Sequence, residues 1–202
     1  YGAKYILKRI FDIIISILLI ILFLPLFIAS ASIIFGRDSS PTVIKQNRIG
    51  LHGKMFGMYK FRTMYNNAHK QRDQLKLSSQ EDSPLFKLDE DPRIITGLGF
   101  LRKYSIDELP QLFNVVKGEM SLVGPRPLFA EDTEYFDKNY MRRLNVLPGM
   151  TGLLQINDRN TDDFKIWYKY DLEYIENWNL KLDVEILFKT LRTVFNRRNS
   201  GK

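Results

Sequence analysis

Two adjacent carboxylic acids, Asp107 and Glu108, are the side chains in this sequence that are best suited to catalysis. A carboxylate can attack an electrophile as a nucleophile, and a neighbouring carboxylate can hold a hard cation such as Mg²⁺. A structural role is also open, because Ser105 and Glu108 have the spacing of a helix capping box and Asp107 would complement the helix dipole. The residues alone favour the structural role, although a helix N-terminus would also keep Asp107 ionised and nucleophilic.

Several basic side chains could surround a phosphorylated substrate, and phosphoryl transfer depends on such positive charge. Lys60 and Arg62 lie two residues apart in an alternating segment, so they are expected on one face of a strand. Arg126 lies between two prolines, where its guanidinium could bind two phosphate oxygens or simply occupy a surface turn. Further phosphate-binding candidates are Arg48, Arg93 and Arg159.

Hydrophobic spacing predicts the elements that would position these side chains. Apolar residues recur at helical spacing over 106–116, which predicts an amphipathic helix that ends at Gly118. Residues 55–63 alternate as in a strand, and 42–44 form a short strand-like stretch. The expected fold is mixed α and β, with a small sheet surrounded by amphipathic helices.

Two further helices are expected toward the end of the chain, over 164–175 and 182–196. Basic side chains lie beside the apolar face of the second: Lys189, Arg192, Arg197 and Arg198. Such a helix suits a membrane surface, but a helix packed on the domain with solvated basic residues explains the pattern equally well. The polar stretch 66–82 lacks a clear period and is interpreted as a mobile helix or loop.

An apolar segment near the start of the chain predicts membrane insertion. Residues 13–36 contain no ionisable side chain and would reach about 36 Å as a helix, enough for a bilayer core of about 30 Å. Pro25 lies in the middle of the segment, where it removes a backbone donor and should kink the helix. Basic residues on both flanks place both ends in the cytoplasm, so a re-entrant helix is favoured over a straight span, which stays an alternative.

Composition bounds the remaining possibilities. The 202 residues are 45% hydrophobic and carry a net charge of +7, which indicates one domain with a real core and an anionic partner. No cysteine is present, which excludes a disulfide framework and a thiolate metal site. Residues 1–38 are interpreted as the membrane anchor and 39–202 as the catalytic domain. Because Tyr1 begins the sequence, we expect it to be part of a longer protein.

The segment KYSIDELPQLFNVVKGEMSLVGPRP, residues 103–127, closely resembles the signature of the bacterial sugar transferase family, the monotopic phosphoglycosyl transferases. Other segments resemble the family in the same order along nearly the whole chain: KRIFD (8–12), QNRIG (46–50), YKFRTM (59–64), DPRI (91–94) and PGMTG (148–152). The resemblance reverses the structural interpretation of the acids, because it implies that Asp107 and Glu108 are the catalytic pair.

The resemblance implies a reaction and a location. Asp107 would attack a UDP-sugar and expel UMP, and the sugar phosphate would then pass to polyprenyl (undecaprenyl) phosphate. Glu108 would hold Mg²⁺ with the substrate diphosphate. The anchor would lie in the bacterial inner (cytoplasmic) membrane among membrane lipids, with the catalytic domain on the cytoplasmic face, in the assembly of an exopolysaccharide, capsule or O-antigen. No nucleic acid partner is expected, and a homo-oligomer is left open.

The sequence departs from the family pattern at several positions, and other functions stay open. Leu147 replaces a basic residue that many members carry, a role that Arg142, Arg143 or Arg159 could take over. Leu153 and Asp158 also differ from the pattern, which leaves the sugar undetermined. The alternatives are a non-catalytic, membrane-tethered basic module that binds acidic lipid or nucleic acid, and a scaffold for a polysaccharide assembly complex.

Overall fold

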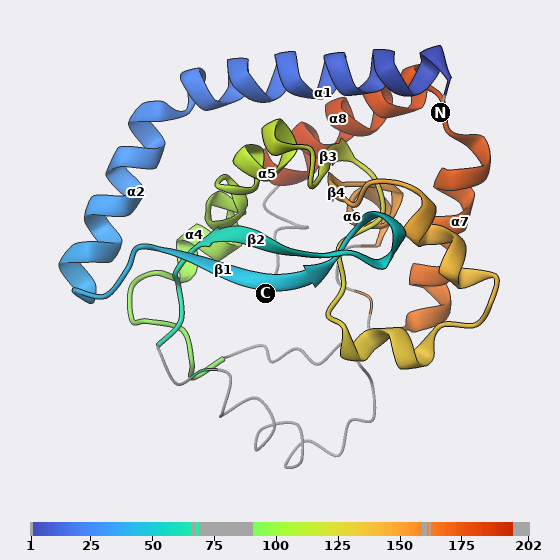
Figure 1. Ribbon diagram of the computed structural model, residues 1–202. Helices are drawn as coiled ribbons and strands as arrows, with labels where there is room; N and C mark the ends of the chain where they lie inside the picture. The colour runs from blue at the N-terminus through green and yellow to red at the C-terminus, as the bar shows by residue number, and fades with distance from the viewer. Residues whose placement is uncertain (1, 66–67, 69–90, 159–160, 162, 196–202) are drawn as a thin grey trace.

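The computed structural model describes residues 2–65, 68, 91–158, 161 and 163–195. Two N-terminal helices form an angle along one side of a body of further helices and small sheets (Figure 1). The first of them runs along the top of the view, and the second descends from it toward a β-hairpin. The expected mixed α and β class is confirmed.

The strands form two small sheets in the described part of the chain. Strand β1 (Val43–Ile49) pairs antiparallel with β2 (Met55–Phe61), through a short turn, η1 (Leu51–Gly53). Strand β3 (Ser121–Val123) pairs parallel with β4 (Gly149–Thr151). The strand predicted over 55–63 is confirmed to Phe61, whereas the short stretch predicted over 42–44 extends into a full strand because β2 pairs along its whole length.

Further helices and 3₁₀ turns pack around the sheets. They are α4 (Gly99–Lys103), η2 (Ile106–Glu108), α5 (Gln111–Lys117), η3 (Glu131–Tyr135), η4 (Tyr140–Asn145), α6 (Leu153–Asn157), α7 (Phe164–Asn177) and α8 (Leu180–Phe195). The two predicted C-terminal helices are confirmed, with ends shifted by one to two residues. The stretch 66–82 lies outside the described residues except for Ala68, as do Arg197 and Arg198.

One helix prediction is wrong in its extent. Residues 106–116 form two separate elements, the 3₁₀ turn η2 and the helix α5, with Pro110 at the junction as the N-cap of α5. A proline has no backbone N–H to donate, so it is better placed at a helix start than inside a helix. The predicted end at Gly118 is confirmed, because this glycine adopts the left-handed conformation with φ of 87°.

The largest hydrophobic cluster joins β2, α5, β3, α7 and α8. Its buried members are Met58, Leu112, Val115, Met120, Leu122, Val123, Tyr174 and Ile186. Side chains of α1 also pack against it, among them Ile15 and Leu19. The first helix is therefore part of the core packing as well as a candidate membrane element.

The N-terminal helices are bent as the proline predicts. Helix α1 (Ala3–Leu22) and helix α2 (Leu24–Arg37) meet at Phe23 with an angle of 61°. Pro25 lies in the first turn of α2, where its missing N–H costs no internal hydrogen bond. Within the described residues, neither helix alone is long and apolar enough to cross a membrane, whereas the bent pair together has the necessary length and composition.

Helix α1 buries two polar residues against the body of the protein. Asp12 and Ser16 are its buried residues, which is the reverse of an ordinary surface helix. Large apolar side chains are exposed along the helix: Ile6, Leu7, Ile10, Ile14, Ile17, Leu18, Ile21 and Leu22. Such a surface is unfavourable in water, so α1 has the composition of a helix covered by a membrane or a partner.

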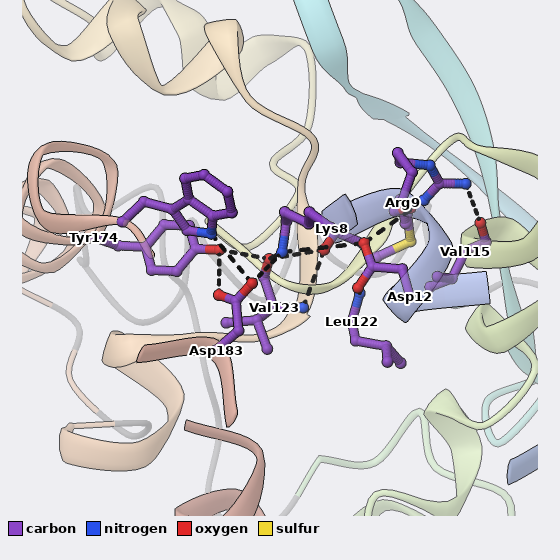
Figure 2. Close-up of polar contacts among 11 residues, drawn as sticks. Lys8, Arg9, Asp12, Val115, Leu122, Val123, Tyr174 and Asp183 are labelled. Carbon is purple, nitrogen blue, oxygen red and sulfur yellow. Dashed lines mark hydrogen bonds and ion pairs between the residues drawn. The ribbon is translucent and has the colours of Figure 1, made fainter. Parts of the chain in front are cut away.

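Ionic contacts fasten α1 to the body (Figure 2). The Lys8 ammonium lies 2.6 Å from a carboxylate oxygen of Asp183 on α8 and 3.2 Å from the Val123 carbonyl oxygen. Arg9 donates to the carbonyl oxygens of Val115 at 2.9 Å and Met120 at 3.1 Å. One carboxylate and three carbonyl oxygens of the body thus bind Lys8 and Arg9, two of the basic residues that precede the apolar segment.

Candidate active site

The candidate acids lie on the isolated 3₁₀ turn η2. Ser105, which precedes the turn, adopts a left-handed conformation with φ of 57°, and its side chain makes no capping hydrogen bond. The backbone closes the turn through a bond from the Glu108 N–H to the Ser105 carbonyl oxygen, 3.1 Å long. The capping box considered for Ser105 and Glu108 is therefore wrong, and Asp107 has no long helix whose dipole could stabilise its charge.

Two cations converge on the acid pair. The Lys60 ammonium lies 3.5 Å from a carboxylate oxygen of Asp107 and 3.1 Å from one of Glu108. The Arg126 guanidinium reaches the same Glu108 oxygen at 3.2 Å. The Arg126 side chain is 33% exposed, so one side of the cluster is open to a ligand. The structure thus brings together four of the side chains that the sequence singled out.

Burial and charge compete at Asp107. Removal of its carboxyl from water raises its pKa, the Lys60 ammonium opposes this effect, and the neighbouring Glu108 carboxylate adds to it. Because the neutral form is favoured by the surroundings, the ionised form is a destabilised and therefore more reactive carboxylate. Such a perturbed acid in contact with a cation is typical of functional sites.

Other predicted cations have partners inside the chain. The Arg62 guanidinium forms an ion pair of 2.9 Å with the Asp38 carboxylate and donates to the Asp38 carbonyl oxygen at 3.1 Å. Arg93 binds both carboxylate oxygens of Asp91, at 2.7 and 2.6 Å. These contacts tie the end of β2 to the end of α2 and stiffen the loop before α4, which is a structural use of both arginines.

Arg48 and Arg159 complete the predicted set. Arg48 lies two residues beyond Gln46 on β1, and the register places its side chain on the same sheet face as Lys60. Its guanidinium stacks 3.3 Å from the centre of the Phe129 ring. Arg159 lies outside the described residues.

The sequence did not predict the hydrogen bonds that hold the backbone at Arg126. Arg143 donates to the Arg126 carbonyl oxygen at 2.6 Å and to the Asp171 carboxylate at 2.9 Å. The Tyr140 hydroxyl donates to the same carboxylate oxygen at 2.7 Å. Burial raises the pKa of Asp171, and the Arg143 guanidinium opposes this shift. The sequence offered one signal, the double arginine Arg142 and Arg143, but no sign of their partners.

A metal ion at this site would be bound jointly by the protein and the substrate. Among the described residues, no group of three or more His, Cys, Asp and Glu side chains is arranged to hold a metal ion. Mg²⁺, however, is commonly bound by one or two carboxylates together with substrate phosphates. The oxygen donors of Asp107 and Glu108 are of the right kind, so the acid pair fits a magnesium ion shared with a diphosphate.

An acid pair beside two cations is suited to group transfer at phosphorus. The chain belongs to the bacterial sugar transferase family, whose sequence profile matches residues 3–197. The family resemblance noted from the motifs is thereby confirmed.

Curated proteins with related sequences agree with this family assignment. The chain is 43% identical over 195 residues to the undecaprenyl-phosphate galactose phosphotransferase of Salmonella typhimurium, covering 95% of this chain and 41% of that protein. It is 38% identical over 197 residues to the exopolysaccharide production protein ExoY of Sinorhizobium fredii, covering 96% and 87%. It is 39% identical over 194 residues to the UDP-N-acetylgalactosamine-undecaprenyl-phosphate N-acetylgalactosaminephosphotransferase of Aeromonas hydrophila, covering 93% and 43%. The chain thus spans about two fifths of the length of the first and third of these relatives.

Proposed function

We propose that this chain is the catalytic part of a phosphoglycosyl transferase, which moves a sugar 1-phosphate from a UDP-sugar to undecaprenyl phosphate. The observation that carries the proposal is the convergence of Lys60 and Arg126 on the buried pair Asp107 and Glu108. The names of the Salmonella and Aeromonas relatives support undecaprenyl phosphate as the acceptor. Their different sugars leave the sugar of this chain open.

The reaction runs in two displacements at one phosphorus atom. A carboxylate oxygen of Asp107 attacks the sugar-linked phosphorus, the bond from this phosphorus to the bridging oxygen breaks, and UMP leaves with the electron pair. A phosphate oxygen of undecaprenyl phosphate then attacks the same phosphorus. The bond to Asp107 breaks, which regenerates the carboxylate and yields undecaprenyl diphosphate sugar.

The surrounding residues stabilise charge during both steps. Lys60 lies between the two acids, so its ammonium can hold Asp107 in position and neutralise oxygens of the transferred phosphoryl group. Arg126 can donate two parallel bonds to phosphate oxygens from the open side of the site. Mg²⁺, when held by Glu108 and the diphosphate, would supply further positive charge at the leaving UMP.

The bent helix pair supports a membrane location for this reaction. We propose that α1 and α2 enter the cytoplasmic leaflet of the bacterial inner membrane and return, so that the acids face the cytoplasm near the lipid carrier. The 61° bend and the exposed apolar face of α1 support this re-entrant arrangement. Basic residues at both ends of the segment favour the same side of the membrane.

Trapping of the covalent intermediate tests the proposal. Enzyme given UDP-sugar without lipid acceptor should retain one sugar phosphate on Asp107, located by fragmentation in a mass spectrometer. Asp107→Asn should lose both the adduct and UMP release, because an amide is a poor nucleophile. This variant should still fold, since burial already favours an uncharged group at this position.

Controls separate this function from the alternatives. Glu185→Gln removes an exposed acid of α8 and should leave the adduct and UMP release unchanged. An adduct on another residue would overturn the role of Asp107. Absence of UMP release from a folded wild-type protein that binds lipid would favour the non-catalytic membrane module or the scaffold instead.

A further inference from the structure

A cavity lies between α2, the β1–β2 hairpin and α5. Its volume is about 290 Å³. It is lined by Phe27, Val43, Tyr59, Pro110, Phe113 and Lys117. Phe27 comes from α2, the second helix of the bent pair, so one wall of the cavity belongs to the candidate membrane element. Four of the six lining residues have purely apolar side chains, which suit a hydrocarbon chain.

Positive charge gathers at the polar edge of this cavity. The Lys117 ammonium donates a hydrogen bond to the Tyr59 hydroxyl and lies 4.5 Å from the centre of the Tyr59 ring. The Lys45 ammonium lies 5.4 Å from the same ring. One acid lies nearby, Glu119, whose carboxylate accepts a hydrogen bond of 2.7 Å from Asn114. The two positive charges of Lys45 and Lys117 exceed this single negative charge. The edge therefore suits an anion.

The two sites lie on opposite faces of the hairpin. Tyr59 and Lys60 are consecutive residues of β2, so their side chains leave the strand on opposite sides. Lys60 reaches Asp107 and Glu108, whereas Tyr59 faces the cavity with its strand partner Lys45. A phosphate bound by Lys117 would therefore not lie where the acid pair reacts.

We propose that this cavity binds an anionic membrane phospholipid, with its phosphate between Lys45, Lys117 and the Tyr59 hydroxyl and part of an acyl chain along Phe27 and Phe113. Apolar walls beside two ammonium groups match the two halves of such an amphiphile. Leu24 and Ile28, on the same helix as Phe27, are further exposed apolar residues that a membrane could cover. The lipid would hold α2 against the hairpin.

The inference goes beyond the proposed reaction and rests only on the proposed membrane location. The test uses the protein reconstituted in phosphatidylcholine nanodiscs that contain a phosphatidylglycerol with a photoactivatable acyl chain. Illumination should label residues that line the cavity, as mapped by mass spectrometry. Lys117→Gln and Lys45→Gln should each lower this labelling about five-fold, the effect of one basic residue at an anionic lipid surface.

Two further variants make the test specific. Val43→Trp should fill the cavity from a half-exposed position on β1 and also abolish most labelling. The control Lys138→Gln removes an exposed lysine of the segment between η3 and η4 and should label as the wild type does. Labelling equal to that of the wild type in both Lys117→Gln and Val43→Trp would overturn the proposed site.

Competition identifies the occupant. Excess unlabelled phosphatidylglycerol should displace the probe. Undecaprenyl phosphate is tested as a second competitor, at concentrations that saturate turnover. If it displaced the probe and phosphatidylglycerol did not, the phospholipid assignment would be overturned and the cavity would be the site of the lipid acceptor. UMP release, measured on the same nanodiscs, reports on the proposed reaction separately, because labelling of the cavity does not require catalysis.

Discussion

At the scale of single residues, Lys60 has the decisive position. Its ammonium contacts both acids and is the main group that lowers the pKa of Asp107 against the effect of burial. A nucleophilic carboxylate must be ionised, so Lys60 increases the reactive fraction of Asp107 at a given pH. In the proposed reaction it also brings a positive charge to the transferred phosphoryl group.

Replacement of this cation should change both the rate and its pH dependence. Lys60→Gln should lower kcat/KM about 100-fold, the usual cost of losing one group that stabilises the transition state. The rate should rise with pH as Asp107 ionises, and this rise should move to higher pH in the variant because the group that lowered the pKa is gone. A pH profile of UMP release measures both effects.

A matched control lies on the same hairpin. Lys54→Gln removes an exposed lysine next to β2 and should leave the profile unchanged. If Lys60→Gln lost activity without any displacement of the profile, Lys60 would act on the substrate alone and not on the ionisation of Asp107.

Residue types revealed the acids and two of their cations, but not the partners of the other arginines. The ion pair of Arg93 could have been predicted, because Asp91 is only two residues away in the sequence. The ion pair of Arg62 could not, since Asp38 lies 24 residues away at the end of α2. An arginine alone in a sequence does not disclose whether its charge is already neutralised inside the protein.

At the scale of elements, local patterns predicted the regular segments and missed the irregular one. Helices α7 and α8 were predicted from their hydrophobic periods, and the buried residues of α7 recur at helical spacing. Strand β2 was also predicted, although its buried residues Met58 and Phe61 lie on opposite faces of the strand. The segment 106–116 keeps a helical period although it is divided at Pro110. Periodicity reports which side chains are buried, and it did not reveal the left-handed backbone at Ser105 that sets the direction of the acid pair.

A side chain from η4 binds the loop that carries Arg126, beside the backbone bond from the Gly149 N–H to the Pro125 carbonyl oxygen. Arg143 bridges the Arg126 carbonyl oxygen and the Asp171 carboxylate, and both of its partners are distant in the sequence. A planar guanidinium can satisfy two such acceptors at once, whereas an ammonium on a flexible stem holds them less firmly. Arg143 is therefore a positioning residue for the candidate site.

Arg143→Lys tests this positioning role while it keeps the charge. We expect turnover to fall about ten-fold, which corresponds to about 1.4 kcal/mol, roughly the worth of one hydrogen bond to a charged group. The loss should appear mainly in kcat, with the adduct forming more slowly on Asp107. Steady-state kinetics and a thermal unfolding curve on the same preparation separate this effect from loss of fold.

The neighbouring arginine provides the control. Arg142 forms an exposed ion pair with Glu176 at 2.9 Å, so Arg142→Lys should change turnover very little. Equal activity of the wild type and a folded Arg143→Lys variant would show that the position of the Arg126 loop does not depend on this guanidinium.

At the scale of the whole molecule, the first helix and the last helix depend on each other. Lys8 and Asp183 are 175 residues apart in the sequence and form a contact of 2.6 Å. The apolar segment after Lys8 predicted an anchor, but no sequence pattern indicated which residues of the body would contact it. Such long-range ion pairs follow from the fold, and no local pattern of charge or hydropathy specifies them.

The last prediction concerns this junction (Figure 2). Asp183 is fully buried and accepts hydrogen bonds from Lys8, from the Tyr174 hydroxyl at 2.8 Å and from the Trp178 indole at 3.1 Å. Asp183→Asn keeps the size of the side chain but removes the carboxylate nearest to the Lys8 ammonium, which leaves Asp12 at 4.0 Å as its remaining ion-pair partner. Because a largely buried ion then loses its close partner, the free energy of unfolding should fall by about 3 kcal/mol.

Double substitution distinguishes loss of the ion pair from loss of packing. Lys8→Met together with Asp183→Asn should be less destabilised than the sum of the two single variants, because the unpaired charge is absent. The exposed acid Glu185 lies on the same helix, and Glu185→Gln should alter the unfolding free energy by less than about 0.5 kcal/mol. Chemical unfolding of each detergent-solubilised variant gives these values. Additive effects of the Lys8 and Asp183 substitutions would show that the two residues stabilise the protein independently, and that α1 is held to the body by its apolar contacts instead.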